Sequence, residues 1–140
     1  MNKIIRPVVE ITYDKLIAVY RCRNNKSKTR NILWKLSRTQ AIELFKGQCH
    51  YCDVPPSSKC NAYITTKRYR IKNHERADEG WVIYNGIDRV DSSGDYEMDN
   101  VVSCCTKCNK AKNNLSKQEF ENWIERMTAY AEKTWWHGKT

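Results

Sequence analysis

Two Cys-x-x-Cys pairs constrain this chain more than any other feature of its sequence. The pairs are Cys49/Cys52 and Cys105/Cys108, and 52 residues separate them. A two-residue gap lets one tight turn present both sulfurs to the same ion, and two such turns complete a tetrahedral four-sulfur zinc site. The ends of the long segment must then meet, with a folded element between them. We expect a structural Zn²⁺ ion that contributes on the order of 10 kcal/mol to folding.

Three further cysteines lie outside these pairs, at Cys22, Cys60 and Cys104. Cys104 could replace Cys105, but only Cys105 keeps the two-residue gap to Cys108. We interpret the three as free thiols that pack as small hydrophobic side chains. Seven cysteines in a chain without a recognisable secretion signal favour metal binding over disulfides.

Charge is the second strong feature, because the 140 residues carry a formal net charge of +9. Residues 1–48 hold 11 Lys and Arg against 3 acidic residues, whereas residues 49–100 hold 7 against 9. Such an excess favours a polyanionic partner, most often nucleic acid, or an acidic membrane face. No apolar run is long enough to span a bilayer, so a soluble, cytoplasmic protein with no membrane partner is expected.

The length and the mixed periodicity predict one α+β domain. Ser37 and Gln40 form a capping box that starts a helix ending near Gly47, and Ser116 with Glu119 starts the last helix in the same way. The other expected elements are a helix over 12–23, a basic loop over 23–31, a short strand over 32–36, a hairpin arm over 62–72, a strand over 81–90, a turn over 91–96 and a short helix over 105–114.

The last helix carries an apolar stripe that predicts packing against the core. Its members recur at helical spacing: Phe120, Trp123, Ile124, Met127, Tyr130 and Ala131. Beyond them, Trp135 and Trp136 could stack on bases, although capping of the helix end is the favoured interpretation.

The residues around the second cysteine pair resemble the HNH endonucleases, the ββα-metal or His-Me finger family. QCHYC and NVVSCCTKCNKAK carry the resemblance, which covers about residues 35–125 and is similar to phage-type members of the recombination endonuclease VII group. It implies a zinc-stapled strand–loop–strand–helix finger with flanking helices, in a bacterial or phage-infected host cytoplasm. The expected parts are a basic N-terminal arm over 1–34, a core over 35–125 with an insert at about 54–80, and a C-terminal helix over 116–140.

The resemblance also implies a catalytic site with one divalent cation beside the scissile phosphate. By position, Asp88 and Asn109 resemble the two metal ligands, and Asn100 resembles the loop asparagine that orients the site through backbone contacts. A carboxylate and an amide oxygen suit Mg²⁺ or Mn²⁺. The ion would stabilise the pentavalent phosphate and the leaving oxygen.

The chain departs from the family at the general base, where Arg89 stands in place of a histidine. Lowering an arginine pKa to neutrality would need a shift of roughly 6 units, about 8 kcal/mol, so Arg89 is expected to clamp the phosphate instead. The base is left open between Asp91, His74 and a metal-bound hydroxide.

Two groups of basic residues are candidates for phosphate contact, with an ordinary solvated face as the alternative. The first group is N-terminal: Arg21, Arg23, Lys26, Lys28 and Arg30. The second flanks the resembling motif: Lys107, Lys110 and Lys112. Lys67, Arg68 and Arg70, with Tyr69 among them, form a weaker third strip.

These observations predict a zinc-containing, metal-dependent endonuclease that hydrolyses DNA phosphodiesters, with RNA as an open alternative. The second hypothesis is a nucleic-acid-binding zinc module without cleavage, and Arg89 is its best argument. A third is a zinc domain that binds an acidic protein. The oligomeric state is left open between monomer and homodimer.

Overall fold

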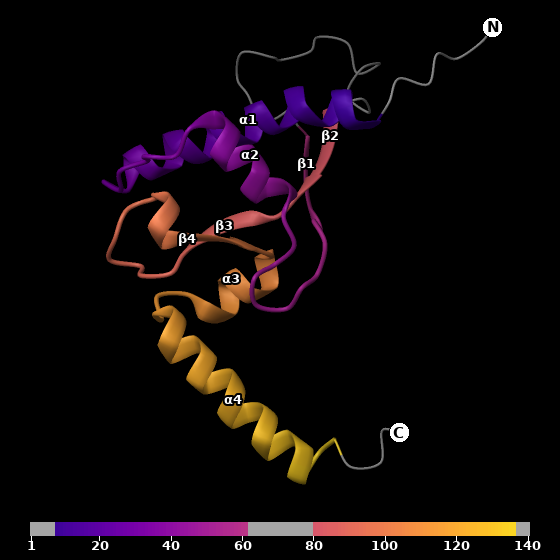
Figure 1. The fold of residues 1–140 in the computed structure, drawn as a ribbon, viewed down its shortest axis with the longest axis vertical. Helices are drawn as coiled ribbons and strands as arrows, with labels where there is room; N and C mark the ends of the chain where they lie inside the picture. The colour runs from indigo at the N-terminus through magenta and orange to yellow at the C-terminus, as the bar shows by residue number, and fades with distance from the viewer. Residues whose placement is uncertain (1–7, 62–79, 137–140) are drawn as a thin grey trace, which may run out of the picture.

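The fold is α+β, as predicted, with helices around two small antiparallel sheets (Figure 1). The computed structural model describes residues 8–61 and 80–136. The predicted hairpin arm over 62–72, the third basic strip and His74 lie outside the described residues. The elements in chain order are α1 (Val8–Thr29), α2 (Arg38–Lys46), β1 (Ser58–Asn61), β2 (Trp81–Tyr84), β3 (Gly86–Arg89), the 3₁₀ turn η3 (Met98–Asn100), β4 (Val101–Cys104), α3 (Thr106–Lys112) and α4 (Lys117–Lys133).

The strand predicted over 81–90 is two strands, because Asn85 interrupts it. β2 pairs with β1, whereas β3 pairs with β4, both antiparallel. Asn85 is fully buried, its backbone N–H donates to Phe45 O at 2.8 Å, and its side-chain amide donates to Gly47 O at 2.9 Å. These hydrogen bonds attach Asn85 to the end of α2. The chain passes from the first sheet to the second at this residue.

The basic segment predicted as a loop over 23–31 is instead the end of α1, which runs to Thr29. Arg and Lys are good helix formers, and the buried Leu16 and Val19 anchor the helix on the core. Asn31, at φ 54°, then turns the chain. The strand expected over 32–36 is wrong as well, since only an isolated bridge between Trp34 and Tyr96 forms there.

Helix α2 begins at the predicted capping box. Ser37 Oγ accepts from Gln40 N–H at 3.1 Å, and Gln40 Oε1 accepts from Ser37 N–H at 2.9 Å. The main core lies between α1, α2 and the two sheets. Its buried members are Leu16, Val19, Leu36, Ala41, Ile42, Phe45, Val82, Tyr84 and Val101.

The second capping box is also confirmed, but the packing predicted for the α4 stripe is wrong. Phe120 and Ala131 are buried, whereas Ile124, Met127 and Tyr130 are 38%, 44% and 63% exposed. Figure 1 shows α4 extending away from the two sheets. Helical periodicity indicates that one face is apolar, but within the described residues only Phe120 and Ala131 of this stripe are buried.

Trp135 and Trp136 directly follow the C-cap of α4, Thr134, as capping of the helix end requires. Trp135 and Trp136 pack edge to face with ring centroids 5.4 Å apart, and Trp136 N–H donates to Ala131 O at 2.9 Å. Both rings stay about half exposed. Within the described part of the chain, no helix has the length and apolar character needed to cross a membrane.

The uneven burial of α4 can be tested with two aromatic truncations. Phe120 packs edge to face on Tyr51 at 5.1 Å, so Phe120→Ala should lower the free energy of unfolding by about 3–5 kcal/mol. Tyr130→Ala should change it by less than about 0.5 kcal/mol. Urea unfolding of both variants measures the difference, and losses of equal size would contradict the described position of α4.

Candidate functional site

The two Cys-x-x-Cys pairs meet and form a cluster that can hold a metal ion such as zinc. The sulfur atoms of Cys49, Cys52, Cys105 and Cys108 all lie within 4.8 Å of one another. Cys104 is fully buried beside the cluster, and its thiol donates to Cys105 O at 3.4 Å. The two-residue gap therefore selects Cys105, as predicted.

Local backbone bonds shape both cysteine turns. In the first turn, Cys49 N–H donates to Val54 O and Asp53 N–H donates to Cys49 O, each at 2.9 Å. In the second, Cys105 is the N-cap of α3 and its sulfur accepts from Cys108 N–H at 3.4 Å. His50 N–H donates to Ser103 O at 2.8 Å and joins the two turns. The sulfur positions are thus fixed by the main chain.

The pKa values of Cys49 and Cys108 are shifted in opposite directions. Burial raises the pKa of Cys49, but hydrogen bonds from the backbone of Cys105, Cys52 and Tyr51 outweigh burial and lower this pKa to about 6. Burial and the hydrogen bonds with the neighbouring sulfurs raise the pKa of Cys108. One thiolate therefore forms readily and opposes the next. A divalent cation at the centre reverses that repulsion and deprotonates coordinating thiols.

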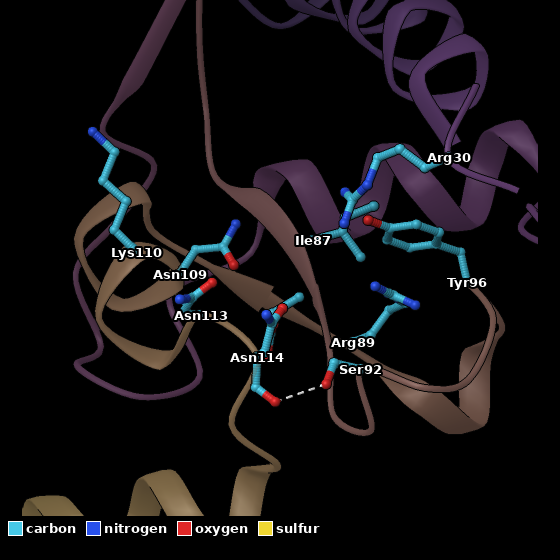
Figure 2. A pocket seen from close by; sticks show the side chains of 10 residues that line it. Arg30, Ile87, Arg89, Ser92, Tyr96, Asn109, Lys110, Asn113 and Asn114 are labelled. Atoms are coloured by element: carbon cyan, nitrogen blue, oxygen red, sulfur yellow. Dashed lines mark hydrogen bonds between the residues drawn. The ribbon is translucent and has the colours of Figure 1, made fainter. Parts of the chain in front are cut away.

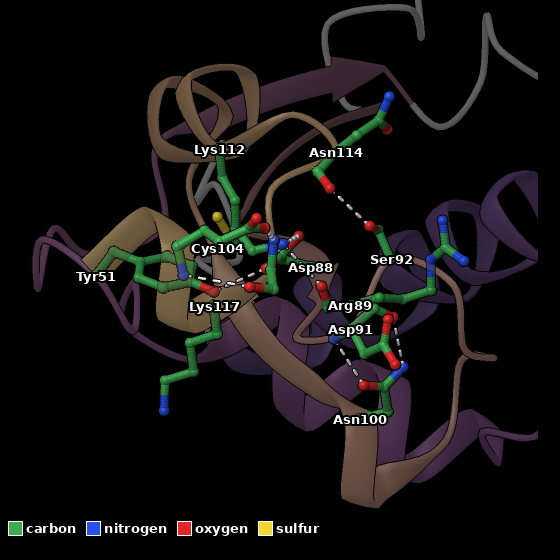
Figure 3. A network of polar contacts seen from close by, with 12 residues as sticks. Tyr51, Asp88, Arg89, Asp91, Ser92, Asn100, Cys104, Lys112, Asn114 and Lys117 are labelled. Atoms are coloured by element: carbon green, nitrogen blue, oxygen red, sulfur yellow. Dashed lines mark hydrogen bonds and ion pairs between the residues drawn. The ribbon is translucent and has the colours of Figure 1, made fainter. Parts of the chain in front are cut away.

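Beside the cluster, β3, the loop over 90–100, β4 and α3 form a strand–loop–strand–helix unit. Asn100 holds the loop, because its side chain accepts from Asp91 N–H at 2.9 Å and donates to Asp91 O and Asp95 O at 3.0 Å (Figure 3). These are backbone contacts of the kind expected for the loop asparagine. Lys117 N–H donates to Val90 O at 3.0 Å and fixes the start of α4 to the same loop.

Asp88 is the buried centre of a polar network (Figure 3). Lys112 Nζ lies 3.3 Å from both carboxylate oxygens of Asp88 and donates to Arg89 O at 3.0 Å. Tyr51 Oη donates to Asp88 Oδ2 at 2.8 Å. Burial and the neighbouring carboxylate raise the pKa of Tyr51 well above its usual value, so its hydroxyl stays a donor.

This network corrects the prediction for Lys112 and adds a residue that sequence reasoning missed. Lys112 is fully buried, so it holds Asp88 and does not reach a phosphate. Tyr51 stands within the QCHYC motif, but nothing in the sequence links it to a carboxylate 37 residues further on. The first cysteine turn brings the two together.

A polar pocket of about 280 Å³ opens beside this network (Figure 2). Asp88, Arg89 and Asn109 line it together, which is the juxtaposition that the resemblance implied. The other lining residues are Arg30, Ile87, Ser92, Tyr96, Lys110, Asn113 and Asn114. The Arg89 guanidinium donates to Gly94 O at 2.7 Å and lies 5.3 Å from the Tyr96 ring centroid. The pocket thus collects two arginines and a lysine around amide and hydroxyl groups, which suits a phosphate.

Asp88 and Asn109 supply the right kind of oxygen for a hard divalent cation. Asn109 is solvent-exposed, whereas the Asp88 carboxylate is already neutralised by Lys112. A divalent ion at this position therefore fits the donor set but competes with the Lys112 ammonium.

Asp91, one of the candidate bases, has the structure of a turn residue. Its Oδ1 accepts from Ser93 Oγ at 2.6 Å and from Ser93 N–H at 2.9 Å. These hydrogen bonds stabilise the carboxylate and lower the pKa of Asp91 below its usual value. A lower pKa makes Asp91 a weaker proton acceptor.

The remaining basic candidates divide by position. Arg23, Lys26, Arg30 and Lys110 line described pockets. Arg21, Lys28 and Lys107 are exposed and line neither described pocket.

Loss of one cysteine of the cluster should remove the metal and most of the stability. Cys108→Ser should bind no zinc and unfold at a much lower temperature, because a structural zinc contributes on the order of 10 kcal/mol. Cys22→Ser, which changes a cysteine outside the cluster, should keep equimolar zinc and near-normal stability. Elemental analysis and thermal unfolding test this, and equal zinc in both variants would disprove the assignment.

The buried ion pair yields a second test. Lys112→Met leaves the Asp88 charge buried without its partner and should cost about 3–5 kcal/mol of unfolding free energy. Adding Asp88→Asn removes that charge, keeps an acceptor for Tyr51, and should recover part of the loss. Chemical denaturation of the single and double variants measures this coupling, and additive losses would contradict it.

Comparisons with known proteins leave the family of this chain open. No protein-family model matches the sequence, and no solved structure matches it. One similar protein is an uncharacterized protein of Acanthamoeba polyphaga mimivirus, 26% identical over 91 residues. The match covers 65% of this chain and 13% of the mimivirus protein, so the chain spans a small part of that protein's length.

Proposed function

We propose that this protein is a zinc-containing, HNH-type endonuclease that hydrolyses DNA phosphodiester bonds. The observation that carries the proposal is the polar pocket in which Asp88, Arg89 and Asn109 lie together on the strand–loop–strand–helix unit. A four-cysteine cluster fixes that unit from one side, which keeps the pocket rigid enough to orient a phosphate.

Each side chain has a specific task in this proposal. Arg30, Arg89 and Lys110 bind non-bridging phosphate oxygens, and the two arginines can each make two parallel hydrogen bonds. Their charge stabilises the extra negative charge of the transition state. Asn109 orients the phosphate from the exposed face of α3. Asp88 and Asn109 would hold Mg²⁺ or Mn²⁺, which would supply an activated water and stabilise the leaving oxygen when bound.

A second candidate function is nucleic-acid binding without cleavage. Two observations favour it: Lys112 already neutralises Asp88, and Arg89 occupies the position where the resembling family has its histidine base. The positively charged pocket would then bind the phosphate without hydrolysing the phosphodiester bond.

A plasmid-nicking assay decides between these functions. Supercoiled plasmid is incubated with zinc-loaded protein and Mg²⁺, Mn²⁺ or no divalent ion. Metal-dependent nicking should fall by about 100-fold in Asn109→Ala, because one positioned transition-state donor is worth that much. Asn122→Ala changes an exposed asparagine of α4 and should nick at the normal rate.

Arg89→His separates the two candidates further. If the wild type nicks nothing and Arg89→His nicks with Mg²⁺, the binding function holds and the endonuclease proposal is wrong. If the wild type nicks and Asn109→Ala does not, the endonuclease proposal stands. Equal nicking by wild type, Asn109→Ala and a mock purification would reveal a contaminating nuclease and disprove it.

A further inference from the structure

A second pocket of about 350 Å³ lies directly beside the first one. The two share lining residues: Arg30, Ile87, Tyr96, Asn109 and Lys110. The shared residues place the two pockets side by side, and we treat them together as one groove. It runs from Asn109 on α3 to the C-terminal half of α1, and is called the α1–α3 groove below. Figure 2 shows Arg30, just after the end of α1, next to Tyr96, and Lys110 of α3 on the other side of Asn109 with its side chain directed away from Arg30.

The charge of the groove comes mainly from one face of α1. Arg23, Lys26 and Arg30 stand three and four residues apart, which places them on one side of the helix and its end. Lys110 of α3 lines the same pocket, and no Asp or Glu is among the residues that line this second pocket. Arg21 and Lys28 fall on the opposite side of the helix at this spacing. Asp88 lines the first pocket but is paired with Lys112, so the cations of the second pocket form an excess of positive charge, which attracts a polyanion.

Aromatic rings line the same pocket. Trp34 and Tyr96 have ring centroids 5.0 Å apart at 36°, and both are partly exposed. Tyr84 lines the wall near Arg23, whose guanidinium donates to its hydroxyl at 2.9 Å. Cations interleaved with aromatic rings are typical of sites that bind single-stranded nucleic acid, where each base offers a face for stacking.

The shape of the groove also favours an unpaired strand. Base pairs of a duplex are stacked inside the double helix, and proteins read them with elements that protrude into its grooves. Here Trp34 and Tyr96 line a pocket and do not protrude from the surface, which favours a base that is free to leave its stack. A volume of about 350 Å³ is at the small end of ligand pockets and suits one nucleotide.

We propose that the α1–α3 groove binds one unpaired nucleotide strand. Its phosphates contact Lys26, Arg30 and Lys110, and one base lies against Trp34 and Tyr96. This inference rests on the proposed nucleic-acid function and adds the form of the substrate: the strand that passes Asn109 is single-stranded at that point.

The test compares two double variants with the same charge loss. Lys26→Gln/Arg30→Gln changes the groove, and Arg21→Gln/Lys28→Gln changes the opposite side of the same helix. Fluorescence anisotropy measures binding to a labelled oligothymidine without divalent ions, so that cleavage plays no part. The groove variant should bind about ten-fold more weakly, with a salt slope reduced by about 1.4, and the matched variant should stay within about two-fold. Equal losses in both variants would overturn the groove as the site.

Three ligands of equal length test the base contact in the wild type. The single strand should bind about ten-fold more tightly than its blunt duplex. A strand without bases should bind at least about five-fold more weakly than oligothymidine, because stacking is lost. Equal binding of duplex and single strand, or of the strands with and without bases, overturns the inference.

These outcomes are separable from those of the nicking assay. A chain that nicks plasmid but binds duplex and single strand equally keeps the endonuclease function and loses this inference. A chain that prefers the single strand but never nicks plasmid loses the endonuclease function and keeps this inference.

Discussion

The meeting of four cysteine sulfurs is the constraint on which the second half of the fold depends. The main apolar core joins α1, α2 and the sheets, but β4 and α3 lie at its edge beside a small cluster of cysteines. Cys105 is both a member of that cluster and the N-cap of α3, so one residue sets the start of the helix and its anchor. A cation bound by this cluster would therefore fix the helix that carries Asn109 and Lys110, and with it the geometry of the pocket.

The buried pair of Asp88 and Lys112 adds a second, more demanding constraint. Two buried charges are tolerated only when each makes further hydrogen bonds. Here Tyr51 donates to the Asp88 carboxylate, and the Arg89 carbonyl accepts from the Lys112 ammonium. The pair joins β3 to the end of α3, while Tyr51 ties both to the first cysteine turn. The same interaction sets a condition on catalysis, because any divalent ion at Asp88 must compete with an ammonium group. Stability and the proposed chemistry thus depend on one carboxylate.

Features that a few neighbouring residues determine could be predicted from the sequence. Both capping boxes and the choice of Cys105 over Cys104 depend on spacings of two or three residues. Predictions failed where distant segments decide. Asn85 breaks a strand because its partners lie at the end of α2 and in the first cysteine turn, and Lys112 is buried because it pairs with Asp88 on β3. Met127 is exposed because its part of α4 extends away from the two sheets. Residue type and periodicity contain no information on such partners.

The length of α1 changes the meaning of the basic segment. In a loop, the five basic residues between 21 and 30 would have no fixed arrangement and could contact phosphate from any side. As a helix, the same residues divide into a face that lines the groove and a face that points away from it, so only Arg23, Lys26 and Arg30 act with Lys110. A helix holds its side chains at fixed positions along the groove, so the proposed strand would pass Asn109 along one path. In this proposal net charge attracts the nucleic acid, and the helical spacing of that charge determines where the strand lies.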